Sequence, residues 1–573
     1  MPFTHLTAAP STASTSTTQD YPKIDVELSV IPCSGSEGSW TPEKHIHPRQ
    51  WSQGRKAYDT CLIVFLEFFT TMISTAGSPV AGHIYADLNL SPVAATCVFV
   101  STYLIGQTIG GVFFPPWSES FGRKKLYVIS TGLYSLSCIL VGKVPTIPGI
   151  VIGRFIGGLL SSVPTIVATG SIEDLWDTNA RVWWLYWWSL VANLGILTGP
   201  VFSDLVMRST HWTWVFYTAA IVTACVTMLL LTIRESRPSV VLARAQALTQ
   251  VQGLSTNTTS PGKIFPSTHE KLDLLRPLRL FFTEPIVFLA AVISAIAFGL
   301  VYLFTEVLPL VYVDMGFGDA SMNLPFLPLV IGMVFSALTR LYDRRVLAER
   351  MSRSLPLTPE SKFAGFIIGA PLLAVGLWLF AWTIPPSTTS AHWIIPTIAL
   401  IPIGYAVNEF DYVLAGYLTD CYQTYSASSF ACLSLARSLL SATFPLFGRA
   451  LFDSLGFNVA TSVFATLATV LCAVPPMLLR TESVIGAIAG AQGSLADSVR
   501  GDGCRVWGFF DGALVEDKVE YAERVVDELS AADFRGHPVQ HDTEEAEEGI
   551  SVFDASISQL RGIVSNCCFR GIL

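Results

Sequence analysis

Residues 115–125 read PPWSESFGRKK, and this short charged stretch lies between two long apolar runs, 93–114 and 125–144. Each run is long enough to cross about 30 Å of hydrocarbon, which takes roughly 20 mostly apolar residues in a helix. A loop with three consecutive cations between two such runs is typical of the cytosolic side of a membrane hairpin. The stretch therefore predicts a protein that spans a membrane.

Reading outward from this hairpin finds apolar runs of the same length along most of the chain. Six precede a polar stretch from Arg234 to Glu284 that is rich in Ser, Thr, Gln and Pro, and six follow it. Two equal sets joined by a linker indicate two related six-helix halves. The predicted spans are 58–80, 93–114, 125–144, 148–170, 182–206, 212–233, 285–310, 324–342, 363–383, 393–416, 428–452 and 457–479.

Composition agrees with this interpretation. Of 573 residues, 51% are hydrophobic and only 14% are charged, against about 25% charged in an ordinary globular chain. A net charge of −9 argues against nucleic acid as a partner, because proteins that bind phosphates cluster Lys and Arg. The acidity is local: residues 491–573 hold 16 acids and 7 bases, whereas the 28 acids and 28 bases before them balance. The lipid bilayer is therefore the expected environment.

The cations predict the orientation of the spans, because Lys and Arg in short loops stay on the cytosolic side. They concentrate before span one, after span two, in the central linker and after span eight, at Arg55, Lys56, Arg123, Lys124, Lys125, Arg234, Arg237, Arg344 and Arg345, among others. Both termini are thus predicted to be cytosolic. We expect a monomer with many spans, most simply in the plasma membrane.

The same reading divides the chain into five segments. Residues 1–56 form a disordered cytosolic arm, 57–233 the N-terminal bundle and 234–284 the cytosolic linker. Residues 285–480 form the C-terminal bundle, and 481–573 are an acidic cytosolic tail to which we assign no role.

The loop after span two matches a motif of a known family. In G-x-L-[AS]-[DE]-R-x-G-R-[KR], the matching positions are Glu119, Gly122, Arg123 and Lys124; the departures are Pro115, Trp117 and Ser120. With this motif the chain resembles the major facilitator superfamily, which implies an all-α fold of two six-helix bundles with pseudo-two-fold symmetry. A carboxylate and cations beside helix ends suit a latch that holds one conformer. The alternative is a plain cluster of cytosolic cations.

Span five carries a second motif. Gly195, Gly199 and Pro200 resemble the antiporter motif G-x-x-x-G-P-x-x-G, with Ser203 in the last place. Two glycines on one face permit close helix contact, and a proline bends the helix. The resemblance implies export in exchange for protons.

The wider resemblance, from about residue 51 to 485, is to the fungal twelve-span drug:proton antiporters, a group that includes polyamine and toxin exporters. It is carried by residues 212–217, 276–286, 392–396 and 427–447. Leu433 stands where many of those relatives have a polar Asn.

Ionisable side chains inside spans are costly, so they are candidates for coupling protons or lining the cavity. These candidates are Glu67, Arg154, Glu306, Glu409 and Arg437. Glu67 lies about 15 Å into span one, near the midplane, and is the candidate for the proton-coupling carboxylate. The alternative for Glu67 is a fixed structural hydrogen bond. The resemblance associates the Arg of span four with proton coupling, and the alternative for Arg154 is a side chain that reaches the outer interface.

Some of these groups are expected to pair. Glu409 and Arg437 lie on adjacent spans at similar depth, so we predict that they form an ion pair across the cavity. Asp411 is expected to be interfacial, and Glu173 and Asp174 to form a solvated span end that faces Arg123 and Lys124.

Together the residues and the resemblance predict an exporter of a small organic molecule that works by alternating access with proton antiport. Acidic groups in the spans favour cationic substrates, although Arg154 and Arg437 could instead bind an anionic substrate. No enzyme activity, cofactor, catalytic residue or metal site is expected, since no phosphate loop, His box or zinc spacing occurs. The alternatives are an uptake carrier or uniporter, or a membrane sensor that does not transport.

The predicted orientation has a direct test. A protease site inserted near Asn257, in the linker, should be cut in inverted vesicles and protected in intact cells, because the linker is expected in the cytosol. The opposite pattern of cleavage would contradict the predicted orientation.

Overall fold

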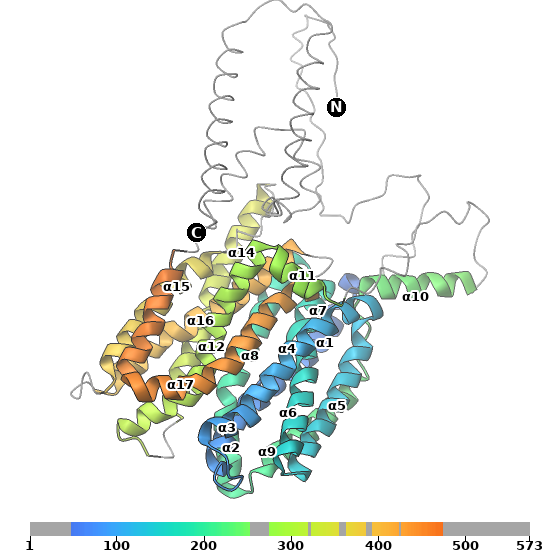
Figure 1. Cartoon of the computed structure of the whole chain (residues 1–573). Coiled ribbons are helices and arrows are strands. Elements are labelled where there is room, and N and C mark those ends of the chain that lie inside the picture. Colours follow the sequence, from blue (N-terminus) through green and yellow to red (C-terminus); the bar gives the residue numbers. More distant parts are fainter. Residues whose placement is uncertain are drawn as a thin grey trace, which may run out of the picture. The chain divides into compact units, whose positions relative to one another are not determined.

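The structure is a computed structural model that describes residues 47–251, 274–318, 323–353, 363–385, 392–422 and 426–473. These residues form helices and no strand, and twelve of the helical segments are long and apolar enough to cross a membrane (Figure 1). The all-α fold and the twelve spans are as predicted. The predicted arm up to residue 46, most of the linker and the acidic tail lie outside the described residues.

The N-terminal half contains spans one to six, and several of them are interrupted. After η2 (Pro48–Gln50), span one consists of α1 (Gln53–Thr75) and α2 (Gly77–Ile84). Span two consists of α3 (Pro92–Thr96), η3 (Cys97–Ser101) and α4 (Thr102–Phe121), and span three is α5 (Arg123–Lys143). The remaining elements are α6 (Ile147–Ser162), η4 (Val163–Val167), α7 (Ala168–Leu175), α8 (Thr178–Ser209) and α9 (Thr213–Leu230).

Two helices outside the spans precede the C-terminal half, α10 (Pro238–Val251) and α11 (Arg276–Thr283). The C-terminal half then consists of α12 (Pro285–Asp314), α13 (Phe326–Phe335) with α14 (Ala337–Ser352), α15 (Ala364–Thr383), α16 (Ile394–Cys421) and α17 (Ser426–Leu471). The last element holds spans eleven and twelve, and the chain turns between them at Gly456, where φ is 79°. The helix of span eight continues ten residues beyond its predicted end at 342. The prediction ended there because the last turns are charged and so do not resemble an apolar span.

Local sequence explains the interruptions. Pro79 has no amide to offer the carbonyl of Thr75, so span one breaks between α1 and α2. Pro92 begins α3 at a position where the missing amide costs nothing. Gly122 adopts a φ of 97°, which lets α4 end and α5 begin with no intervening loop.

Small residues bring the helices of each half into close contact. A Cβ at Gly158 would lie 1.8 Å from the carbonyl oxygen of Tyr103, so α6 and α4 touch through their backbones. The C-terminal half repeats this contact between α13 and α16, where a Cβ at Gly332 would lie 1.9 Å from the carbonyl oxygen of Ile401. Spans two and four thus pack like spans eight and ten, as two related halves require.

The outward faces of the helices are apolar. Ile129 and Leu136 on α5 and Leu205 on α8 are each 60% exposed, and Val470 near the end of α17 is 64% exposed. Large aliphatic side chains on many helices at once suit contact with lipid tails, and the chain is a multi-pass membrane protein.

The close helix contacts predict which glycines tolerate a methyl group. Gly158→Ala should lower the free energy of unfolding by about 1–3 kcal/mol, because the new Cβ forces α4 and α6 apart. Gly416→Ala is the matched control, since a Cβ there meets nothing within 4 Å. Thermal unfolding of the two purified variants checks this, and equal stability would contradict the packing described.

Candidate functional site

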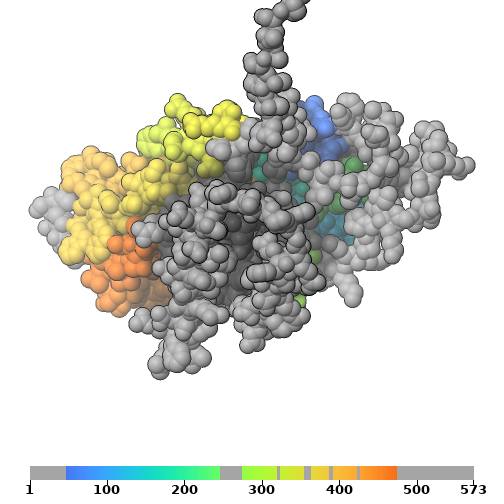
Figure 2. Space-filling view, turned by 90° about the horizontal axis from the view of Figure 1, so that it is seen from above, coloured from blue at the N-terminus to red at the C-terminus, as the bar shows by residue number. Residues whose placement is uncertain are grey.

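Charged residues join the two halves at one end of the bundle. We call this end, where α1 begins and α11 and α14 lie, the linker face, and the opposite end, with α2 and α3, the distal face (Figure 1). Seen from the linker side, the two halves lie on opposite sides of the view (Figure 2). Glu119 of α4 accepts hydrogen bonds from the amide of Ser428 at 2.9 Å and from its hydroxyl at 2.7 Å. Because Ser428 belongs to α17, the first residue of the predicted latch does bridge the halves, and Arg276 approaches it at 3.4 Å.

The other latch residues hold the N-terminal half together. Arg123 donates from Nε to Asp174 at 2.6 Å, and Lys124 donates from Nζ to the carbonyl of Leu231 at 2.8 Å. The carboxylate of Glu235 accepts the backbone amides of Arg123 and Lys124 at 2.8 and 3.1 Å, which caps the start of α5. Glu235 is not among the residues predicted from the sequence, although its position just after span six, between Arg234 and Arg237, is a visible signal.

A second bridge between the halves passes through Arg181, and the sequence did not predict this ion pairing. Arg181 at the start of α8 pairs with Glu173 of its own half and, at 2.6 Å, with Asp420 of α16 in the other half. Glu173 has a second cationic partner, Arg49 from the segment before span one, at 3.0 Å. Glu173 and Asp174 are 3% and 5% exposed, so the predicted solvated span end is wrong: both are buried in ion pairs.

His47 caps the turn that positions Arg49. Its Nδ1 accepts the backbone amide of Arg49 at 3.2 Å, which requires an unprotonated ring nitrogen. Partial burial and the neighbouring Arg49 guanidinium lower the pKa of His47 below its usual range, in agreement with that role.

The next layer toward the bundle centre contains a buried ion pair. Arg437 of α17 binds Asp411 of α16, and its guanidinium lies 3.9 Å from the centre of the Phe298 ring. Ser189 of α8 donates to Asp411 at 3.0 Å, which ties this pair to the N-terminal half. Asp411 is 2% exposed, so the prediction that it is interfacial is wrong.

Glu409 has a different partner from the one predicted. It pairs with Arg340 of α14. The side chain of Arg340 is fully buried; it also forms an ion pair with Asp343 at 2.8 Å, and its guanidinium lies 3.6 Å from the centre of the Tyr412 ring. The predicted pair of Glu409 and Arg437 is therefore wrong.

Glu67 differs from the other buried acids. Its side chain is fully buried on α1, and among the described residues it forms no ion pair with a Lys, Arg or His. The hydroxyl of Thr165 faces it, and the ionisable groups around it are Tyr127, Tyr302, Asp411 and Arg437. The alternative for Glu67, a fixed hydrogen bond to a neighbouring helix, stays open, because Thr165 of η4 lies within reach of the carboxyl.

The antiporter motif packs α8 against α1. A Cβ at Gly195 would lie 2.0 Å from the hydroxyl of Thr71, and one at Gly199 would lie 2.1 Å from the hydroxyl of Thr75. Pro200, next in the motif, lines a cavity on the distal face.

This distal cavity has a volume of about 360 Å³ and is lined by both halves. Glu306 of α12 lies in its wall together with Asp204 of α8 and Asp453 of α17. Within the described ranges, no three His, Cys, Asp or Glu side chains gather at the spacing of a metal site.

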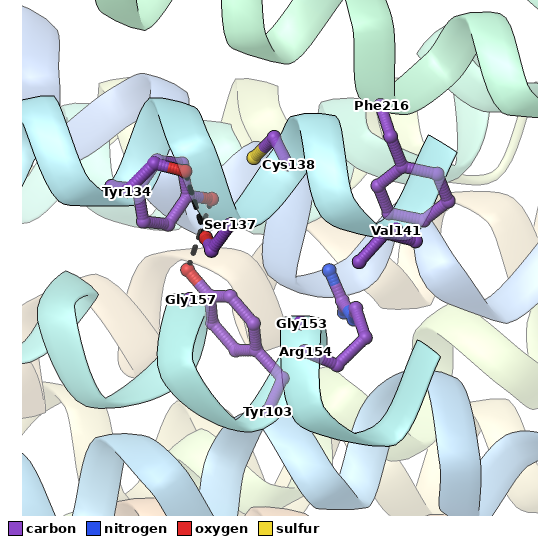
Figure 3. Close-up of a pocket in the computed structure, with 9 residues that line it drawn as sticks. All are labelled: Tyr103, Tyr134, Ser137, Cys138, Val141, Gly153, Arg154, Gly157 and Phe216. Carbon is purple, nitrogen blue, oxygen red and sulfur yellow. Dashed lines mark hydrogen bonds between the residues drawn. The ribbon is translucent and has the colours of Figure 1, made fainter. Parts of the chain in front are cut away.

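Arg154 lies apart from the contacts between the halves. It is 2% exposed on α6, between the rings of Tyr103 and Phe216 (Figure 3). It bonds to backbone carbonyls of spans one and two, so the alternative in which it reaches the outer interface is wrong.

Two six-helix halves with a cavity between them are the architecture of a membrane transporter. The sequence profile of the Major Facilitator Superfamily matches residues 61–419, and the chain belongs to this superfamily. A solved structure of the proton:xylose symporter XylE shares the fold, with a TM-score of 0.55 at 18% identity over 74% of this chain and 95% of that one.

Several fungal transporters are similar along most of the chain. The MFS-type transporter penM of Penicillium rubens is 27% identical over 81% of this chain and 95% of its own length. The efflux pump FUB11 of Gibberella moniliformis is 31% identical over 70% of this chain and 68% of its own. The multidrug transporter TPO1_1 of Candida glabrata is 26% identical over 81% and 85%.

The revised pairing predicts the result of double-mutant cycles. Asp411→Asn alone should cost on the order of 3–5 kcal/mol of stability, because it leaves Arg437 as an uncompensated buried charge. Adding Arg437→Gln should cost much less than its single effect. Denaturant unfolding in detergent measures this coupling.

The matched control is the cycle of Glu409→Gln with Arg437→Gln, which should be close to additive because these residues have separate partners. Strong coupling in the control cycle, or none between Asp411 and Arg437, would contradict the pairing.

Proposed function

We propose that this protein exports a small organic molecule by alternating access, in exchange for protons. The observation that carries the proposal is an asymmetry between the two faces. Buried charged contacts join the halves at the linker face through Glu119 and Arg181, whereas the distal face has a cavity lined by both halves. One side of the path is closed and the other hollow, as expected for one state of an alternating carrier.

The positive-inside rule assigns the linker face to the cytosol, with both termini on that side. In this orientation the cavity faces outward, and the bridges at Glu119 and Arg181 must break before substrate enters from the cytosol. The names of similar proteins, an efflux pump and a multidrug transporter, support export, as does the antiporter motif at Gly195 and Gly199. We further propose a monomer in the plasma membrane.

The charges around the cavity favour a cationic substrate. Asp204, Glu306 and Asp453 are among its lining residues, and its described lining contains no Lys or Arg. Asp204 is paired with Arg208 at 2.8 Å, so Glu306 and Asp453 are the acids that chiefly favour a cation. The two buried cations that could have bound an anionic substrate have other partners: Arg437 pairs with Asp411, and Arg154 donates to backbone carbonyls. Drug-like or polyamine-like cations therefore fit better than anions.

Glu67 is the proposed proton-coupling residue. A carboxylate without a paired cation is costly in a low-dielectric interior, and Glu67 has no such cation among the described residues, so we propose that this site can take up and release a proton. Rearrangement of the halves around α1 changes which groups face Glu67, and this change would load and release the proton. Proton and substrate can then compete without sharing a site.

Replacement of the carboxyl tests this role. Glu67→Gln should leave a folded protein that exchanges substrate down its gradient but no longer accumulates it when a pH gradient is imposed. The measurement uses proteoliposomes and a toxic organic cation, selected by growth of exporter-deficient yeast that overexpresses the protein.

Glu67→Asp is the control, since it keeps an ionisable carboxyl and should keep part of the pH-driven transport. If Glu67→Gln retains pH-driven export at the parental level, Glu67 does not couple protons. If the parent itself accumulates the cation in the direction of the proton gradient, the protein is an uptake carrier.

A further inference from the structure

Arg154 is a buried cation that donates hydrogen bonds to three backbone carbonyls. Its Nε donates to the carbonyl of Phe99 at 2.6 Å, Nη1 to that of Ile73 at 3.0 Å, and Nη2 to that of Ser74 at 2.9 Å. Among the described residues, no Asp or Glu forms an ion pair with it. The guanidinium therefore donates to three carbonyls from two different spans.

These carbonyls lie where the two spans are interrupted. Ile73 and Ser74 belong to the last turn of α1, and the final four carbonyls of a helix have no partner within it. Phe99 belongs to η3, the π-helical turn between α3 and α4, a geometry that often occurs at functional sites. One side chain thus satisfies backbone groups at both interruptions.

The two interruptions are also packed against each other. A Cβ at Gly77, the first residue of α2, would lie 2.7 Å from the carbonyl oxygen of Phe99 and 3.1 Å from Nη2 of Arg154. Only a glycine permits this approach. Gly77, Phe99 and Arg154 therefore form one junction between span one, span two and span four, which we call the Arg154 junction.

The short helices that leave the Arg154 junction form a wall of the distal cavity. This wall consists of Ser78, Pro79, Gly82 and His83 from α2 and of Pro92, Val93 and Thr96 from α3. Arg154 is not among the lining residues of that cavity. The space beside Arg154 has a volume of only about 10 Å³, room for one water at most, so a substrate does not reach it (Figure 3).

We propose that Arg154 is a positioning residue: through the directions of its guanidinium N–H groups, it fixes α2 and α3 and so sets the opening of the distal cavity. Its planar fork of donors suits three carbonyls at fixed angles, which a lysine ammonium cannot reproduce. This role rests on the alternating access proposed above, but it does not depend on proton antiport.

A distance measurement separates positioning from charge. Spin labels at Tyr85, which follows α2, and at Leu455 in the C-terminal half report the width of the distal face; both side chains are exposed. Electron–electron resonance on the full chain in nanodiscs, with other reactive cysteines replaced, gives the distance distribution. Arg154→Lys and Arg154→Met should both shift and broaden it. A parental distribution in Arg154→Lys would show that charge alone suffices and would overturn the proposal.

A second variant decides the question if the Arg154 variants do not fold. Gly77→Ala leaves Arg154 in place but pushes α2 away from Phe99, so it should shift the same distribution. Gly82→Ala is the control for this distance, because it makes the same change within α2 and its Cβ meets nothing within 4 Å. If Gly77→Ala matches Gly82→Ala, the Arg154 junction does not set the opening.

Transport assays add a readout that structural damage alone would not give. The residual pH-driven transport of Arg154→Lys should keep the parental pH dependence, because the variant disturbs the geometry and not the proton site. A shifted pH dependence would make Arg154 part of the proton path and overturn the positioning role. Failure of proton coupling at Glu67 would leave the distance measurements, and this proposal, unaffected.

Discussion

A charge inside a bilayer must find its partner within the protein, and this constraint organises the structure. Replacing water around an ion is so costly that buried cations and anions occur together. Here Arg123 pairs with Asp174, and Arg437 pairs with Asp411. Arg154 shows a second solution, since backbone carbonyls freed by helix breaks serve as its acceptors. The interruptions of spans one and two and the buried Arg154 thus depend on each other.

The pairs are of two kinds, and the difference bears on the alternating access proposed above. Arg123 with Asp174 and Arg340 with Glu409 each lie within one half, where they stiffen the bundle as a body. Contacts such as Glu119 with Ser428 cross between halves, so they break when the halves separate. Rigid halves joined by breakable polar contacts at one face are what a rocking carrier needs.

The sequence predicted the fold because the length of an apolar span is a local property. It did not predict the burial of Asp411, Glu173 and Asp174, which depends on the helices that pack around them. It could not predict partners, which depend on the direction of each side chain around its helix. Glu409 and Asp411 are two residues apart and point about 200° away from each other, so only Asp411 faces Arg437. The acceptors of Arg154 were equally hidden, because they are carbonyls whose freedom depends on where packing breaks the helices.

Glu67 is a fully buried acid that forms no ion pair among the described residues, and the proposed proton coupling requires that it can hold a proton in this state. Infrared difference spectroscopy of the protein in lipid, with isotope-labelled glutamate, measures this directly. We predict that the carbonyl stretch of a protonated glutamic acid is present at neutral pH and is lost in Glu67→Gln. A parental spectrum without that band, or a band that persists unchanged in Glu67→Gln, would contradict the account.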